Sequence, residues 1–135
     1  MASRNVNDLH PELQPLFIKF MHEATVQGVD VLCTCTYRSG AEQDALYAQG
    51  RTVGGHIVTN ARAGQSAHNY TIKGKPAAKA FDVVVMQNGK PDWNTVGDSL
   101  LLWQKLGKIG VDLGLNWYGA PGAKFKEFPH FQLKD

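Results

Sequence analysis

Cysteine and long hydrophobic runs are both scarce in this sequence. The 135 residues include two cysteines, and no window approaches the roughly 20 consecutive apolar residues of a membrane span. Residues 1–8 lack the apolar stretch of a signal peptide, so we expect synthesis in the cytoplasm and no stable membrane association. Repeats, low-complexity tracts and linkers are also lacking, which predicts one domain over residues 1–135.

Charge is sparse as well. Lys and Arg number 14 and Asp and Glu number 12, giving a formal net charge of +2. The pI of about 8.6 suits a polyanionic partner, but there is no Lys/Arg run or basic helix. We therefore expect no nucleic-acid partner, and a monomer is the default expectation.

The two cysteines, Cys33 and Cys35, are separated by one residue in a stretch rich in β-branched and apolar side chains. Residues two apart on a strand share a face, which suits two small, reduced core side chains. Such a pair is poorly placed to close a disulfide on itself. A redox or metal-binding role is the alternative.

Hydrophobic periodicity and turn residues predict a mixed chain. Ser39 and Glu42 have the spacing of a capping box, and Asn88-Gly89 is typical of a two-residue hairpin turn. Helices and strands do not alternate strictly, which favours the α+β class. The predicted elements are helices over 11–27, 40–50 and 95–113, strands over 29–36, 81–86, 115–118 and 128–133, and a long loop over 51–79.

Two histidine–acid pairs point to metal chemistry. His68 precedes Asp82 in the middle of the chain, and Glu127 precedes His130 near its end. Two imidazoles and a carboxylate are a ligand set with which Zn²⁺ keeps a fourth position open, and the second acid is available for proton transfer. These spacings are less specific than H-E-x-x-H, and a surface Asp interrupting a strand is the alternative for Asp82. The remaining histidines, His10, His22 and His56, are interpreted as ordinary surface or hydrogen-bonding residues.

Taken together, the motifs resemble the M15 family of zinc D,D-/L,D-peptidases, in particular its branch of phage endolysins and L-alanyl-D-glutamate endopeptidases. The resemblance covers nearly the whole chain, and its specificity lies in the order and spacing of short pieces. The main pieces are Leu9-His10-Pro11, Tyr37-Arg38-Ser39, Leu46-Tyr47-Ala48-Gln49-Gly50-Arg51, Ser66-Ala67-His68-Asn69-Tyr70, Gly114-Leu115-Asn116-Trp117 and Pro129-His130-Phe131-Gln132. The implied fold is a small antiparallel sheet flanked by helices, of the hedgehog/D-Ala-D-Ala peptidase type, without a separate cell-wall-binding domain.

The resemblance also implies roles for individual residues. His68, Asp82 and His130 are expected to hold one zinc ion, with Glu127 as general base and Arg38 stabilising charge on the scissile carbonyl. Four further residues are expected at the substrate: Ser66 and Gln43 supporting Arg38 or the substrate backbone, and Tyr70 and Trp117 as cleft walls. A core position is the alternative for Trp117.

One departure from the family pattern lies between the first two ligands. His68 and Asp82 are separated by thirteen residues, where the family pattern has six, because residues 71–77 are inserted. The turn-like, polar sequence of this segment predicts that it loops out as a hairpin and leaves the ligand set intact.

By resemblance, the expected reaction is zinc-dependent hydrolysis of the L-alanyl-D-glutamate bond in the peptidoglycan stem peptide. A phage endolysin of this kind accumulates in the host cytoplasm and reaches the wall through a membrane pore. A D-alanyl-D-alanine carboxypeptidase or dipeptidase is the nearest alternative. A non-catalytic, zinc-stabilised wall-binding module is a further one, which the presence of Glu127 and Arg38 disfavours.

Overall fold

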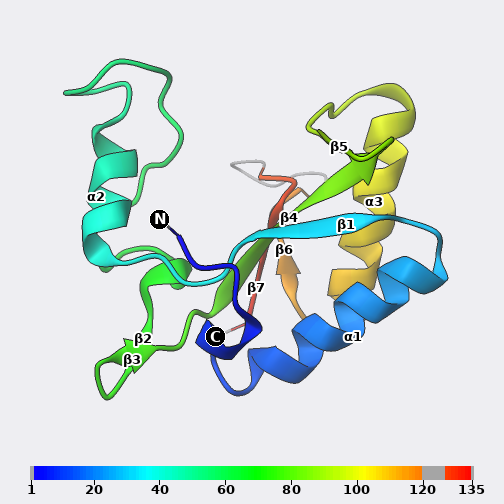
Figure 1. Ribbon diagram of the computed structural model, residues 1–135, viewed down its shortest axis with the longest axis horizontal. Helices are drawn as coiled ribbons and strands as arrows, with labels where there is room; N and C mark the ends of the chain where they lie inside the picture. The colour runs from blue at the N-terminus through cyan, green and yellow to red at the C-terminus, as the bar shows by residue number, and fades with distance from the viewer. Residues whose placement is uncertain (1, 120–126, 135) are drawn as a thin grey trace.

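The computed structural model describes residues 2–119 and 127–134 as an α+β fold, the class predicted from the sequence (Figure 1). A five-stranded antiparallel sheet has the order β1-β4-β7-β6, with β5 also paired to β4. Its strands are β1 (Val31–Cys35), β4 (Ala80–Gln87), β5 (Lys90–Asp92), β6 (Asn116–Trp117) and β7 (His130–Gln132). The helices are α1 (Leu13–Val26), α2 (Gly40–Ala48) and α3 (Gly97–Asp112), with short 3-10 turns η1 (Val6–Asp8) and η2 (Ala67–Asn69).

The core lies between the sheet and the pair of helices α1 and α3. Phe17 and Phe20 of α1 pack edge-on against Phe81 of β4, and Phe81 stacks on Phe131 of β7. Figure 1 shows α2 well apart from these two helices, so it takes no part in this packing. None of the described helices is both long and apolar enough to cross a membrane.

Helix α3 approaches the sheet closely because two of its residues have no side chain. A Cβ on Gly107 would lie 2.3 Å from Trp117, and one on Gly110 would lie 2.5 Å from Phe131. Phe131 is fully buried, so the aromatic ring has no room to move away. These glycines therefore let α3 lie directly against β6 and β7.

Two tight turns follow the local sequence as predicted. Asn88 and Gly89 both have positive φ in the two-residue turn that joins β4 to β5. The inserted segment forms a second hairpin, β2 (Thr71–Ile72) with β3 (Lys75–Pro76), whose turn is Lys73-Gly74. The insertion therefore loops out before β4 begins, and the predicted unstructured stretch over 51–79 contains this hairpin as well as η2.

The capping box at the start of α2 is also confirmed. The Ser39 hydroxyl accepts a hydrogen bond from the Glu42 backbone N–H, and the Glu42 carboxylate accepts one from the Ser39 N–H. This cap fixes the direction in which α2 leaves β1, directly after Arg38.

Candidate metal centre

The candidate site is centred on Asp82, in the middle of the sheet. Asp82 pairs with Cys35 of β1 on one side and with His130 of β7 on the other. Directly opposed residues of antiparallel strands place their side chains on the same face. Three strands distant in sequence therefore bring a thiol, a carboxylate and an imidazole together.

His68 reaches the same point from η2. The Ser66 hydroxyl caps this turn by accepting a hydrogen bond from the His68 backbone N–H. The His68 Nδ1 lies 2.8 Å from the Thr36 carbonyl oxygen, which only accepts, so Nδ1 carries the proton. In the neutral ring the lone pair is then on Nε2, which lies 3.2 Å from Asp82 Oδ1.

The Nε2 atom of His68 is a candidate ligand atom. Among the described side chains it is one of few buried polar atoms without a partner of full hydrogen-bond geometry, and its close contact is the ionic one with Asp82. His68 itself is 2% exposed, so this contact is shielded from water. A buried ring nitrogen that faces a carboxylate at this distance needs a positive charge between the two atoms, and a bound metal ion would supply that charge in place of a proton.

His130 completes the cluster with its Nδ1 atom. This atom lies 3.1 Å from the same Asp82 Oδ1, and the rings of His68 and His130 are 5.1 Å apart at 79°. On its other side, Nε2 of His130 lies 2.8 Å from the Gln132 Oε1 acceptor. Both oxygens are acceptors, so the single proton of the neutral ring faces one of them; an ion bound at Nδ1 would place that proton on Nε2, where Gln132 accepts it.

The charges of this cluster compensate one another. Burial alone would raise the pKa of the Asp82 carboxyl, but the charge on His68 and the contact with His130 hold it well below its usual range. Burial alone would lower the pKa of His68, but the Asp82 carboxylate outweighs burial and raises it. A bound divalent ion would take the place of that imidazole proton.

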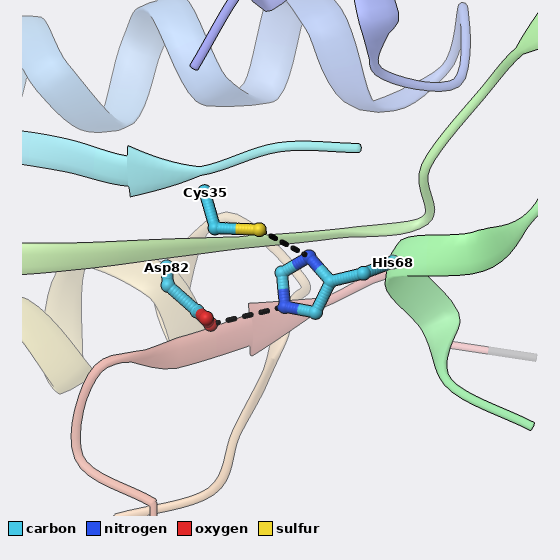
Figure 2. A group of neighbouring side chains, drawn as sticks. All are labelled: Cys35, His68 and Asp82. Carbon is cyan, nitrogen blue, oxygen red and sulfur yellow. Dashed lines mark hydrogen bonds and ion pairs between the residues drawn. The ribbon is translucent and has the colours of Figure 1, made fainter. Parts of the chain in front are cut away.

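Cys35 lies beside this cluster, but it faces the opposite ring nitrogen of His68 from the one that faces Asp82. Its Sγ is 3.6 Å from Nδ1 of His68, whereas Asp82 faces Nε2 (Figure 2). The three residues are close enough to be considered a metal site on their own. However, one ion cannot bind both ring nitrogens, and Thr36 already engages Nδ1. We therefore assign the candidate ligands to Nε2 of His68, Oδ1 of Asp82 and Nδ1 of His130.

Both cysteines are reduced and buried, in line with the first of the two interpretations from sequence. Burial raises the pKa of the Cys33 thiol to about 11, which keeps it protonated. The proximity of Cys35 to His68 was not predicted. The alternation along its strand indicates only that Cys35 is buried, and a buried residue can also lie beside a functional site.

Arg38 and Gln43, both predicted from the sequence, lie together next to the cluster. The Arg38 guanidinium donates to Gln43 Oε1 at 2.9 Å and lies 3.9 Å from Asp82 Oδ2. Gln43 is fully buried, and its amide donates to the Ala61 carbonyl at 2.7 Å. Gln43 therefore holds Arg38 in place, and Arg38 lies against the oxygen of Asp82 that does not face the histidines.

The cluster opens into a cleft of about 1430 Å³. Glu127, Ser66 and Tyr70 line this cleft together with Arg38 and the three candidate ligands. The volume exceeds the 300–1,000 Å³ typical of small-molecule pockets, which suits an extended substrate.

Trp117 is not among the residues that line the cleft. Its ring stacks with Phe131, and its indole N–H donates to the Phe128 carbonyl at 2.9 Å. The structure thus places it in the packing between β6 and α3, the alternative left open by the sequence. Gln132 was missed as a site residue, although its position two residues after His130 on a strand indicates a shared face.

Two histidines and an aspartate at an open cleft, beside a small antiparallel sheet, are a donor set typical of metal-dependent hydrolases. Comparisons with known proteins agree with this class. Residues 6–115 match the VanY family, described as D-alanyl-D-alanine carboxypeptidase. The chain is also 37% identical to the peptidoglycan L-alanyl-D-glutamate endopeptidase CwlK of Bacillus subtilis, over 94% of this chain and 74% of CwlK. The chain belongs to the VanY family of M15 peptidases, as its motifs predicted.

Solved structures support the fold. The L-Ala D-Glu endopeptidase ChiX of Serratia marcescens matches with a TM-score of 0.59 at 20% identity, covering 99% of this chain and 89% of ChiX. The LD-carboxypeptidase LdcB and the D,D-dipeptidase VanXYg match with TM-scores of 0.67 and 0.62, each at 18% identity over 93% of this chain. This chain spans 58% and 50% of those two proteins. The predicted D-Ala-D-Ala peptidase-like fold is thereby confirmed.

Proposed function

We propose that this protein is a zinc-dependent peptidase that hydrolyses the L-alanyl-D-glutamate bond of the peptidoglycan stem peptide. The observation that carries the choice of bond is the 37% identity to an endopeptidase of that name, over 94% of the chain. Zinc is supported by the donor set of two imidazoles and one carboxylate, in which both Nε2 of His68 and Nδ1 of His130 face Oδ1 of Asp82.

His68, Asp82 and His130 are the residues that would hold the ion. When bound there, zinc supplies Lewis acidity, which activates water near neutral pH and polarises the scissile carbonyl. Glu127, in the cleft lining, accepts a proton from the attacking water and passes it to the departing amine. Arg38, braced by Gln43, directs positive charge into the cleft, where negative charge develops on the carbonyl oxygen.

A D-alanyl-D-alanine carboxypeptidase is the second candidate, because the matching family carries that description. A synthetic stem pentapeptide with both bonds separates the two candidates by mass spectrometry of the products. Endopeptidase activity releases a fragment with a new N-terminal D-glutamate, which is the result we expect. Loss of the terminal D-alanine alone would move the protein to the carboxypeptidases.

The role of Glu127 is tested separately from the metal. We expect Glu127→Gln to bind zinc and unfold like the wild type, while turnover falls by about 10²–10⁴-fold, the usual contribution of a positioned acid–base group. Near-normal turnover of that variant would remove Glu127 from the mechanism.

We further propose that the enzyme acts as an endolysin, accumulating in a host cytoplasm and reaching the wall through a membrane pore. The support is the resemblance of the motifs to the phage branch of the family. Added to Gram-negative cells with a permeabilised outer membrane, the protein should lower turbidity, whereas Glu127→Gln should not. Equal clearing by both would contradict wall cleavage as the cause.

A further inference from the structure

Lys79 places a positive charge in the cleft beside the candidate metal ligands. Its backbone N–H donates to the Ala67 carbonyl at 2.9 Å, and its carbonyl accepts from Leu133 at 2.9 Å. Lys79 is thus fixed between the residue before His68 and the end of the chain segment that carries His130. Its side chain lines the same cleft as these ligands.

Tyr70 forms a support for this ammonium group. The Lys79 Nζ lies 4.0 Å from the centre of the Tyr70 ring, a cation–π contact. The same ring lies 5.9 Å from that of His10, and Tyr70 is 40% exposed and lines the cleft. The ammonium is therefore held by an aromatic ring, which leaves its hydrogen-bond donors available.

Lys79 differs from Arg38 and Asp82, which also line the cleft, in lacking an ionic partner among the described residues. Arg38 lies near Asp82, and Asp82 contacts both histidines. Within residues 2–119 and 127–134, no ion pair joins Lys79 to a carboxylate. The cleft thus presents one lysine whose charge is not compensated by the described part of the chain.

The substrate of the proposed function carries a matching group. A D-glutamyl residue enters a peptide through its amine and one carboxyl, so its second carboxyl remains free, and it adjoins the bond to L-alanine when the chain continues through the side-chain carboxyl. We propose that Lys79, supported by Tyr70, binds this free carboxylate and makes the enzyme selective for a D-glutamyl residue that carries it. The inference rests on the proposed function and specifies which group of the substrate the cleft recognises.

The experiment compares two synthetic stem peptides that differ only at this group, one with the free carboxylate and one with the carboxamide. Steady-state kinetics are measured for the wild type, Lys79→Met and Lys79→Arg. Because a charge-assisted hydrogen bond is stronger than a neutral one, we expect the kcat/KM of the wild type to be roughly 10- to 100-fold higher for the carboxylate peptide than for the carboxamide peptide. Lys79→Met should lose that preference, mostly through KM, while its rate on the carboxamide stays within about twofold of the wild type. Lys79→Arg should retain part of the preference for the carboxylate, because it keeps the positive charge.

Lys75→Met is the matched control. Lys75 lies on β3, is exposed and does not line the cleft, so removal of its charge should leave the preference intact. Zinc content and thermal unfolding of each variant show whether the fold and the metal site are unchanged. Equal losses on both peptides in Lys79→Met, or a wild type without preference, would overturn the assignment of Lys79. Failure of the wild type to cut either peptide at L-alanyl-D-glutamate would instead refute the proposed function, and the inference with it.

Discussion

The hydrogen bond from His130 to Gln132 should set the zinc affinity of the site. The Nε2–Oε1 distance is 2.8 Å, and this acceptor stabilises the tautomer that leaves Nδ1 available to an ion beside Asp82. Gln132→Leu keeps a similar volume and the backbone pairing of β7 but removes the acceptor. His130 then loses its preferred proton position and its ring orientation.

The size of this effect follows from the bond itself and from the freedom that its loss gives the ring. A partly buried hydrogen bond contributes about 0.5–1.5 kcal/mol, and outer partners of metal-bound histidines typically change affinity by about 10–100-fold. We therefore expect Gln132→Leu to bind zinc about 10-fold or more weakly, equivalent to at least about 1.4 kcal/mol. Gln132→Glu keeps an acceptor and adds a negative charge, so its affinity should equal or exceed that of the wild type.

Competition with a chromophoric chelator at constant pH measures these affinities directly. Thermal unfolding of the metal-free variants shows whether the fold is retained, since the side chain of Gln132 is only partly buried. A Gln132→Leu variant with wild-type zinc affinity would refute the reasoning. So would equal losses in the Leu and Glu variants, because the acceptor would then be irrelevant.

Three further predictions concern the ligands, the packing and the pH dependence. Asp82→Ala should fold but bind no stoichiometric zinc by elemental analysis, and full zinc retention would remove Asp82 from the ligand set. Gly110→Ala should lower the free energy of unfolding by about 1–3 kcal/mol in chemical denaturation, since its Cβ would lie 2.5 Å from Phe131; a more stable variant would contradict this packing. Hydrogen bonds from Ser99 and Gln87 lower the pKa of Asp92 in the folded protein. Asp92 therefore stabilises the fold above its unfolded-state pKa of about 4, and this contribution is lost as the pH falls through the lower folded-state pKa. The Tm difference between wild type and Asp92→Asn should therefore be present at pH 7 and vanish in strong acid, and a pH-independent difference would count against it.

Local sequence signals predicted much of the fold. The capping box at Ser39, the turn at Asn88-Gly89 and the hairpin within 71–77 each depend on a few adjacent residues, and the structure contains all three. Helix α3 ends at Asp112, just before Gly114, whose φ of 87° suits a glycine after a helix. Features of this kind are encoded by neighbours in the chain, so they are accessible without a structure.

The arrangement around Asp82 depends instead on which strands lie side by side. Alternation along β1 indicates a shared face for Cys33 and Cys35, but a register shift between them places Cys35 opposite Asp82. The pairing of Asp82 with His130 follows from the strand order, which no local pattern specifies. The ligand set was therefore accessible from family resemblance, whereas the hydrogen bonds that orient each ligand required the structure.

Zinc-dependent release of D-glutamate N-termini from purified Gram-negative peptidoglycan is the most direct test of the central claim. The protein is stripped with a chelator, titrated back with Zn²⁺, and the released peptides are identified by mass spectrometry at each zinc occupancy. The account predicts no release from the stripped protein and release that rises in proportion to zinc, up to one ion per chain. Undiminished release at zero zinc, or no new D-glutamate N-terminus from a fully loaded and folded sample, would contradict it.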